Sequence, residues 1–154
     1  DLGAGNGILG IGALLLGAPN AIFVEIDADV CESLRNAISS LNLDDRCRIL
    51  NGDVCTLEEG QLIRDLVIMN PPWGRQTPRA DRPFLDAATK CARDSIHLLH
   101  GRGASHIESW AEKAGWEAKK WMEVDLPMPA IYSHHTKKMR TTEAAMWWIK
   151  RPAR

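Results

Sequence analysis

The chain has 154 residues, of which 45% are hydrophobic and 25% are charged, and its formal net charge is −1. This length and composition are those of an ordinary globular protein, and we expect residues 1–154 to form a single domain with one core. The near-neutral charge argues against a protein that is basic all over. Its apolar stretches are too short to cross a bilayer and no signal peptide is visible, so we expect a cytoplasmic protein.

Strand-like and helical patterns alternate along most of the chain, which predicts an α/β fold with a mostly parallel sheet. The expected helices cover residues 8–17, 29–41, 57–63, 86–96 and 105–114. The expected strands cover residues 21–27, 46–53, 67–69 and 97–100. Two further strand-like runs, 118–126 and 143–150, have no helical pattern between them and predict an antiparallel hairpin at the C-terminal end of the sheet.

The first ten residues, DLGAGNGILG, contain the pattern G-x-G-x-x-G. Glycines let the backbone turn sharply and approach a ligand, and the helix that follows directs free N–H groups at it. Asp1 is expected to order this turn by accepting backbone N–H bonds. No strand precedes the turn, so the sequence looks truncated at its N-terminus. The other candidate cofactor-binding residues here are Gly3, Gly5, Asn6, Gly7 and Ile8.

Two acidic residues lie at the ends of the next two strands. Glu25 follows the glycine turn by about 20 residues, where a carboxylate can accept hydrogen bonds from both ribose hydroxyls. Asp53 can accept one from the exocyclic amine of adenine, with the backbone of Val54 nearby. An Asx-type loop cap is an equally good interpretation of Asp53. Together these features predict an adenosine-containing cofactor, and the spacing fits both a nicotinamide dinucleotide and S-adenosylmethionine.

The segment DLVIMNPPWG runs from a buried strand into an amide, two prolines and an indole. The prolines end strand pairing where a parallel sheet presents its ligand-binding edge. Asn70 Oδ1 and the Pro71 carbonyl can accept both N–H bonds of an amino group and so fix the direction of its lone pair. Trp73 supplies a stacking platform, and Pro72 helps to hold the loop rigid.

The chain resembles the class I S-adenosylmethionine-dependent methyltransferases that modify exocyclic or amide nitrogens. The resemblance is carried by DLGAGNG, Glu25, GDV and NPPWG, in this order. In that group the Asn-Pro-Pro-aromatic loop is the catalytic motif. The resemblance implies a Rossmann-like sheet and S-adenosyl-L-methionine as cofactor. It leaves several acceptors open: an adenine in RNA or DNA, a guanine amine, or a protein glutamine amide. Two other functions remain open, a dinucleotide-dependent oxidoreductase and a catalytically inactive RNA-binding module.

A closer resemblance is to the methyltransferase-like protein 5 family. It is carried by VIMNPPWG, the loop RQTPRADR, FLDAA, IHLLH and DLPMPAIYSHHTKK, and it covers nearly the whole chain. It implies N6-methylation of an adenosine in small-subunit ribosomal RNA, and a small zinc-binding activator subunit as partner. The chain departs from the family pattern twice. Trp73 stands where the family usually has Phe, and the N-terminal Gln-Tyr-x-Thr segment that helps to close over the cofactor is absent.

Two groups of basic and imidazole side chains are candidates for RNA binding, because a positive track beside the catalytic loop attracts phosphates. An ordinary solvated loop is an equally good interpretation of any one of these residues. The group after the catalytic loop comprises Arg75, Arg79 and Arg82. The group near the C-terminus comprises His134, Lys137, Lys138 and Arg140.

The four cysteines and most tryptophans are expected to have structural roles. Cys31, Cys47, Cys55 and Cys91 form no Cys-x-x-Cys pair and have no histidine at metal-ligand spacing, so we expect buried, reduced thiols and no metal site. Trp147 and Trp148 are adjacent in a predicted strand and must point to opposite faces of the sheet.

Overall fold

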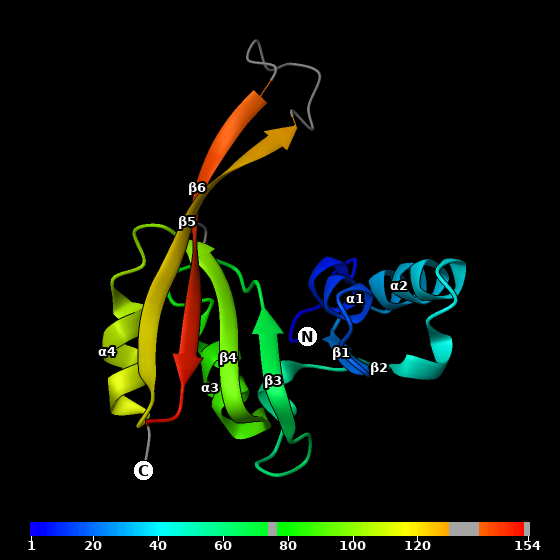
Figure 1. Ribbon diagram of the computed structural model, residues 1–154, viewed down its shortest axis with the longest axis horizontal. Helices are drawn as coiled ribbons and strands as arrows, with labels where there is room; N and C mark the ends of the chain where they lie inside the picture. Colours follow the sequence, from blue (N-terminus) through cyan, green and yellow to red (C-terminus); the bar gives the residue numbers. More distant parts are fainter. Residues whose placement is uncertain (74–76, 130–138, 153–154) are drawn as a thin grey trace.

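The computed structural model describes residues 1–73, 77–129 and 139–152 (Figure 1). The helices are α1 (Ile8–Leu15), α2 (Ala28–Ser40), α3 (Arg82–Cys91) and α4 (His106–Lys113), with 3₁₀ turns at Asp44–Arg46 and Val54–Thr56. The strands are β1 (Ala21–Glu25), β2 (Cys47–Asn51), β3 (Arg64–Met69), β4 (Ala92–Gly101), β5 (Glu117–Pro129) and β6 (Met139–Lys150). Among the described residues, no helix is both long enough and apolar enough to cross a lipid bilayer.

The sheet combines parallel and antiparallel pairs, as the sequence predicts. β1 pairs with β2, and β3 with β4, in parallel; β6 pairs antiparallel with both β4 and β5. Leu2 joins the two parts of the sheet, because its backbone makes parallel bridges to Val24 in β1 and Met69 in β3. The resulting order is β2, β1, Leu2, β3, β4, β6 and β5. The C-terminal ends of β1, β2 and β3 therefore meet at one edge, where open α/β folds bind ligands.

Helices pack on both faces of the sheet, and the alternation of side chains along β1 shows why. Phe23 belongs to a core cluster with residues of α1 and α2, whereas Val24 belongs to a cluster with residues of α3 and α4. Successive strand residues point to opposite faces, so each helix layer receives its own apolar side chains. α2 begins at Asp27, whose Oδ1 accepts from the backbone N–H groups of Asp29 and Val30.

Two expected helices differ from the structure. Residues 57–63 contain no helix and residues 59–62 form turns; the helical residues lie just before them, at Val54–Thr56. The helix expected over 86–96 occupies Arg82–Cys91, and residues 92–96 belong to β4. Ala92, Ser95 and Ile96 pair with β3, and Ser95 and Ile96 also pair with β6, so the ladder hydrogen bonds outweigh the local helical pattern.

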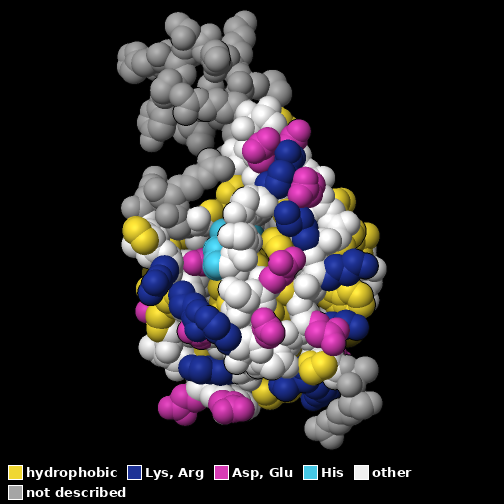
Figure 2. Space-filling view, turned by 90° about the vertical axis from the view of Figure 1, so that its left-hand side faces the viewer, with side chains coloured by type: hydrophobic (Ala, Val, Ile, Leu, Met, Phe, Trp, Pro, Cys, Tyr) yellow, Lys and Arg dark blue, Asp and Glu magenta, His cyan; other side chains and the backbone are white. Residues whose placement is uncertain are grey.

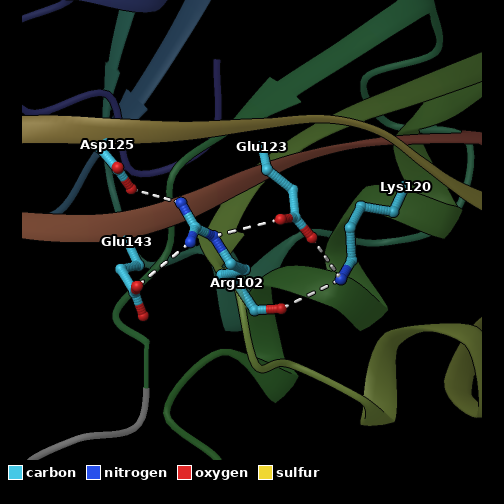
Figure 3. A network of polar contacts seen from close by, with 5 residues as sticks. All are labelled: Arg102, Lys120, Glu123, Asp125 and Glu143. Atoms are coloured by element: carbon cyan, nitrogen blue, oxygen red, sulfur yellow. Dashed lines mark hydrogen bonds and ion pairs between the residues drawn. The ribbon is translucent and has the colours of Figure 1, made fainter.

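The antiparallel hairpin is longer than expected and projects beyond the rest of the sheet (Figure 1). Asp125 of β5 lies opposite Glu143 of β6, which places two negative charges side by side. Arg102, just after β4, offsets them: its guanidinium contacts Asp125, Glu143 at 3.1 Å and Glu123 at 3.3 Å (Figure 3). Arg102 thereby fastens the base of the hairpin to the end of β4.

Candidate active site

A large cavity lies at the edge where β1, β2 and β3 end. Its volume is about 750 Å³, within the usual range for a small-molecule site. Glu25 is the last residue of β1, Asp53 follows β2, and Asn70 directly follows β3. The lining residues are Gly3, Val24, Glu25, Ile26, Gly52, Asp53, Val54, Asn70, Pro71, Pro72, Trp73, Phe84, Leu126 and Thr142.

The glycine turn borders this cavity through Gly3. Its backbone has a φ of +67°, and an added Cβ would come within 2.6 Å of the Phe84 ring, so a larger residue does not fit. Gly5 has a φ of +54° with open space beside its Cα. Asp1 Oδ2 accepts from the backbone N–H of Gly10 at 2.8 Å, an ordering role of the kind the sequence suggested.

Five of the predicted cofactor-binding residues are not among those lining the cavity. Asn6 turns its side chain back on the chain, where Oδ1 accepts from the N–H of Ile8 at 3.2 Å. The Ile8 side chain is exposed. The predicted residues outside the lining are Asp1, Gly5, Asn6, Gly7 and Ile8.

Glu25 and Asp53 present carboxylates at the cavity while their oxygens also order the backbone. Glu25 Oε2 accepts from the N–H of Gly5 at 2.8 Å, and Oε1 accepts from that of Asp27 at 3.0 Å. Asp53 Oδ1 accepts from the N–H of Cys55 at 2.8 Å, and this bond lowers the pKa of the Asp53 carboxyl. Asp53 is therefore the loop cap that the sequence allowed, and it lines the cavity as well. Each oxygen retains a lone pair for a ligand hydroxyl or amine.

The Asn-Pro-Pro-Trp segment lines the same cavity. Pro71 is buried, whereas the Asn70 side chain is exposed to the cavity. The indole N–H of Trp73 donates to Asn70 Oδ1 at 2.9 Å, a contact within the motif that the sequence did not predict. The acceptor oxygen is thus held in place by the aromatic ring of its own motif, with a second lone pair still available.

Trp73 also borders a second cavity of about 330 Å³ on its other side. There its ring stacks on the imidazole of His100, with 6.0 Å between ring centroids and 22° between the planes. Burial lowers the pKa of His100, and the nearby Asp81 carboxylate opposes this effect. The position of Trp73 therefore depends on residues at the end of β4 as well as on its own loop.

Several residues that line the cavity were not predicted from the sequence. Phe84 lies in α3, and Leu126 and Thr142 face the cavity from β5 and β6. Leu126 and Thr142 form a cross-strand pair, so their approach to the site depends on how far the hairpin extends beyond β4. The sequence predicted the hairpin, but it carried no signal for its direction.

The two groups of predicted RNA-binding residues are only partly described. Arg79 is exposed after the catalytic loop, and Arg82 forms an ion pair with Asp86 at 3.0 Å, which offsets its charge. On the face shown in Figure 2, basic side chains are interspersed with acidic ones. Arg75, His134, Lys137, Lys138 and the side chain of Arg140 lie outside the described residues.

Comparison with known proteins gives consistent results. Residues 1–95 match the family described as Conserved hypothetical protein 95. The chain is 32% identical to the rRNA N(6)-adenosine-methyltransferase METTL5 of Danio rerio, over 90% of this chain and 68% of that protein. It is 34% identical to the protein MJ0284 of Methanocaldococcus jannaschii, over 90% of this chain and 67% of its relative.

A solved structure is also similar to this chain. The crystal structure of PH1948 from Pyrococcus horikoshii superposes with a TM-score of 0.86 at 30% identity, covering 99% of this chain and 74% of the other. These similarities separate the chain from the dinucleotide-dependent oxidoreductases that its glycine pattern alone would allow. The chain belongs to the Conserved hypothetical protein 95 family and is a class I S-adenosylmethionine-dependent methyltransferase of the METTL5 type.

Proposed function

We propose that this enzyme transfers the methyl group of S-adenosylmethionine to the N6 amine of an adenosine in ribosomal RNA. The observation that carries the proposal is that one cavity is lined both by Glu25 and Asp53, at the ends of β1 and β2, and by the Asn-Pro-Pro-Trp segment, after β3. We call the first group the cofactor wall, because it carries acceptors for an adenosine cofactor, and the second the substrate wall, because it carries acceptors for an amine, so that donor and nucleophile can meet in one cavity.

On the cofactor wall, the carboxylate of Glu25 accepts from the ribose hydroxyls. The carboxylate of Asp53, whose lowered pKa keeps it ionised, accepts from the adenine amine. The turn at Gly3 lets the backbone approach the amino-acid end of the cofactor. The remaining residues of the turn and the start of α1 support this wall by shaping the turn: Asp1, Gly5, Asn6, Gly7 and Ile8. Val54 lies beside the adenine.

On the substrate wall, Asn70 Oδ1 and the Pro71 carbonyl accept the two N–H bonds of the target amine. Trp73 stacks on the base, which contributes roughly 1–3 kcal/mol in comparable sites. The nitrogen lone pair forms the new N–C bond as the C–S bond of the sulfonium breaks. The products are S-adenosylhomocysteine and a cationic amine, which then loses its proton to solvent.

The nature of the substrate rests on the relatives. METTL5 of Danio rerio and Mettl5 of Drosophila melanogaster are both rRNA N(6)-adenosine-methyltransferases, and the second is 29% identical over 96% of this chain. We propose that the substrate is RNA of the small ribosomal subunit and that a small zinc-binding activator subunit is the partner. We also propose that the enzyme acts as a single domain in the cytoplasm. The RNA phosphates would contact Arg75, Arg79, Arg82, His134, Lys137, Lys138 and Arg140.

The test is a parallel assay of labelled methyl transfer to small-subunit ribosomal RNA, adenine-containing DNA and a glutamine-containing protein. We expect transfer to the RNA, recovery of the label as N6-methyladenosine, and much slower transfer with Asn70→Ala. The exposed α2 residue Asn36 provides the control variant Asn36→Ala, which should retain activity. Transfer to DNA or protein in preference to RNA would refute the proposed substrate.

A further inference from the structure

Three side chains that are distant in sequence meet behind Trp73. Asp81 directly precedes α3, His100 lies near the end of β4, and His106 is the first residue of α4. Their ligand-type atoms all lie within 4.8 Å of one another. Asp81 Oδ2 is 2.5 Å from His106 Nε2 and 3.2 Å from His100 Nε2. Two imidazoles and a carboxylate thus converge on one point.

Two of these three side chains are buried, so their polar atoms destabilise the fold unless a binding partner satisfies them. Asp81 is 4% exposed and His100 is 2% exposed. Among the described residues, neither ring nitrogen of His100 makes a hydrogen bond, although His100 Nε2 lies 3.2 Å from Asp81 Oδ2. A buried polar atom without a partner costs roughly 1–3 kcal/mol. His100 therefore has an unused ligand atom directed at a buried carboxylate.

The charges around the cluster favour a cation over an anion. The second cavity, of about 330 Å³, is lined by Trp73, His100, His106 and Glu143, and it gives access from solvent because the His106 side chain is half-exposed. The only arginine in its lining, among the described residues, is Arg102. The charge of Arg102 is already offset by Glu123, Asp125 and Glu143. A phosphate would meet uncompensated acids here, whereas a divalent cation would be stabilised by them.

We propose that Asp81, His100 and His106 bind a divalent transition-metal ion, with zinc as the best match. Imidazole nitrogen and carboxylate oxygen both bind zinc at about 2.0–2.2 Å. Tetrahedral geometry then places two ligands roughly 3.3–3.5 Å apart. The Asp81–His100 separation of 3.2 Å already approaches this value. The shorter Asp81–His106 contact must open, and the exposed His106 ring has room to move.

This site differs from the sequence-based expectation of no metal, which rested on the spacing of the cysteines. The three ligands are separated by 19 and 6 positions along the chain, the differences between residues 81, 100 and 106, and only the fold unites them. An ion here would hold the imidazole of His100, on which the Trp73 ring stacks. The metal would then stabilise the aromatic platform from behind without contacting the methyl donor.

The experiment measures the metal content of the purified chain after chelator treatment, incubation with zinc and removal of free metal. We expect a single zinc ion per chain. His106→Gln is the main variant because its half-exposed side chain can be replaced without disturbing the core, and we expect it to lose most of the zinc. His97→Gln, in the same strand as His100 but outside the cluster, should retain it.

A second measurement separates binding from folding. Zinc should raise the melting temperature of the parent chain and of His97→Gln, and should leave that of His106→Gln unchanged, because only a ligand that binds the native state stabilises it. The absence of bound zinc in the folded parent chain would overturn the proposal and leave Asp81 and His106 as an ordinary hydrogen-bonded pair. Equal zinc content in the His106→Gln and His97→Gln variants would also overturn it.

Discussion

The indole N–H of Trp73 donates a hydrogen bond to Oδ1 of Asn70 over 2.9 Å. The base platform and the amine acceptor of the proposed active site are therefore coupled within one four-residue segment. This contact explains a chemical advantage of Trp over Phe at this position, because only the indole can both stack on a base and orient the amide.

Replacing Trp73 tests these two contributions separately. Trp73→Phe keeps an aromatic face but removes the donor, so we expect kcat to fall while KM for RNA changes little. Trp73→Ala removes the stacking as well, and a loss of roughly 1–3 kcal/mol corresponds to a KM increase of about 5- to 150-fold. Steady-state methyl-transfer kinetics would show the difference. Identical kinetics for Trp73→Phe and the parent enzyme would exclude a role for the hydrogen bond.

Asn70→Ala should slow transfer by about 100-fold without preventing cofactor binding. The amide oxygen holds the amine in line with the methyl group, and misplacement of a reacting group by an ångström costs about 100-fold in rate. Single-turnover assays would measure the rate, and calorimetry with S-adenosylhomocysteine would measure cofactor affinity. A variant that loses affinity and rate in the same proportion would place Asn70 in cofactor binding instead.

Glu25→Gln should weaken cofactor binding. Both carboxylate oxygens accept backbone N–H groups, and a glutamine amide would turn a donor toward one of them. Hydrogen bonds to charged groups contribute roughly 1.5–3 kcal/mol, so we expect the dissociation constant for S-adenosylmethionine to rise about 10- to 150-fold. Glu32→Gln, at an exposed position of α2, is the matched control. Unchanged affinity for Glu25→Gln in calorimetric titrations would contradict the proposed ribose contact.

Arg102→Ala should destabilise the hairpin, because it leaves Asp125 and Glu143 facing each other across β5 and β6. The arginine side chain is 31% exposed, so we expect a loss of only about 1 kcal/mol in the free energy of unfolding. The double variant Arg102→Ala/Glu143→Gln should recover part of this loss. Urea denaturation of all four members of the cycle gives the coupling. If the effects of the two single variants on the free energy of unfolding simply add in the double variant, Arg102 does not interact with Glu143.

The structure helps to explain which parts of the fold were predictable. The end of β3 was predictable because Asn70 and two prolines interrupt an apolar run, a purely local signal. Likewise, Trp147 is buried and Trp148 is 41% exposed, as strand alternation requires. The start of β4 was not predictable, because residues 92–96 are extended only through pairing with strands distant in sequence. The position of Leu126 over the site depends on the same kind of long-range contact.

The thiols show the same division between local and long-range signals. All four cysteines are free thiols, but the expectation that they are buried is right only for Cys31 and Cys91; Cys47 is half-buried and Cys55 is exposed. Spacing alone excluded a Cys-x-x-Cys motif, yet it could not say which thiols the core would cover. The Asp81, His100 and His106 cluster escaped detection for the same reason, since no short window of sequence contains more than two of its members.

Gly3→Ala should destabilise the protein, because the backbone has a φ of +67° and the new methyl group would overlap the Phe84 ring. We expect a loss of at least about 1 kcal/mol. Gly12→Ala is a useful control, since this glycine lies inside α1 with nothing within 4 Å of an added Cβ, and a gain of roughly 0.5–1 kcal/mol is expected there. Thermal and urea unfolding would compare the two. A stable Gly3→Ala protein would mean that the ring moves aside easily.

The contact between residue 3 and residue 84 also constrains how the family can evolve. A glycine in the cofactor turn and an aromatic ring in α3 share one small volume, so neither position can vary alone without opening a gap or creating a clash. Relatives should therefore keep both the glycine and an aromatic ring at these positions, because the φ of +67° disfavours any side chain at residue 3 and a smaller residue at position 84 would leave a gap. An alignment in which the two positions change independently would show that the shared volume imposes no such constraint.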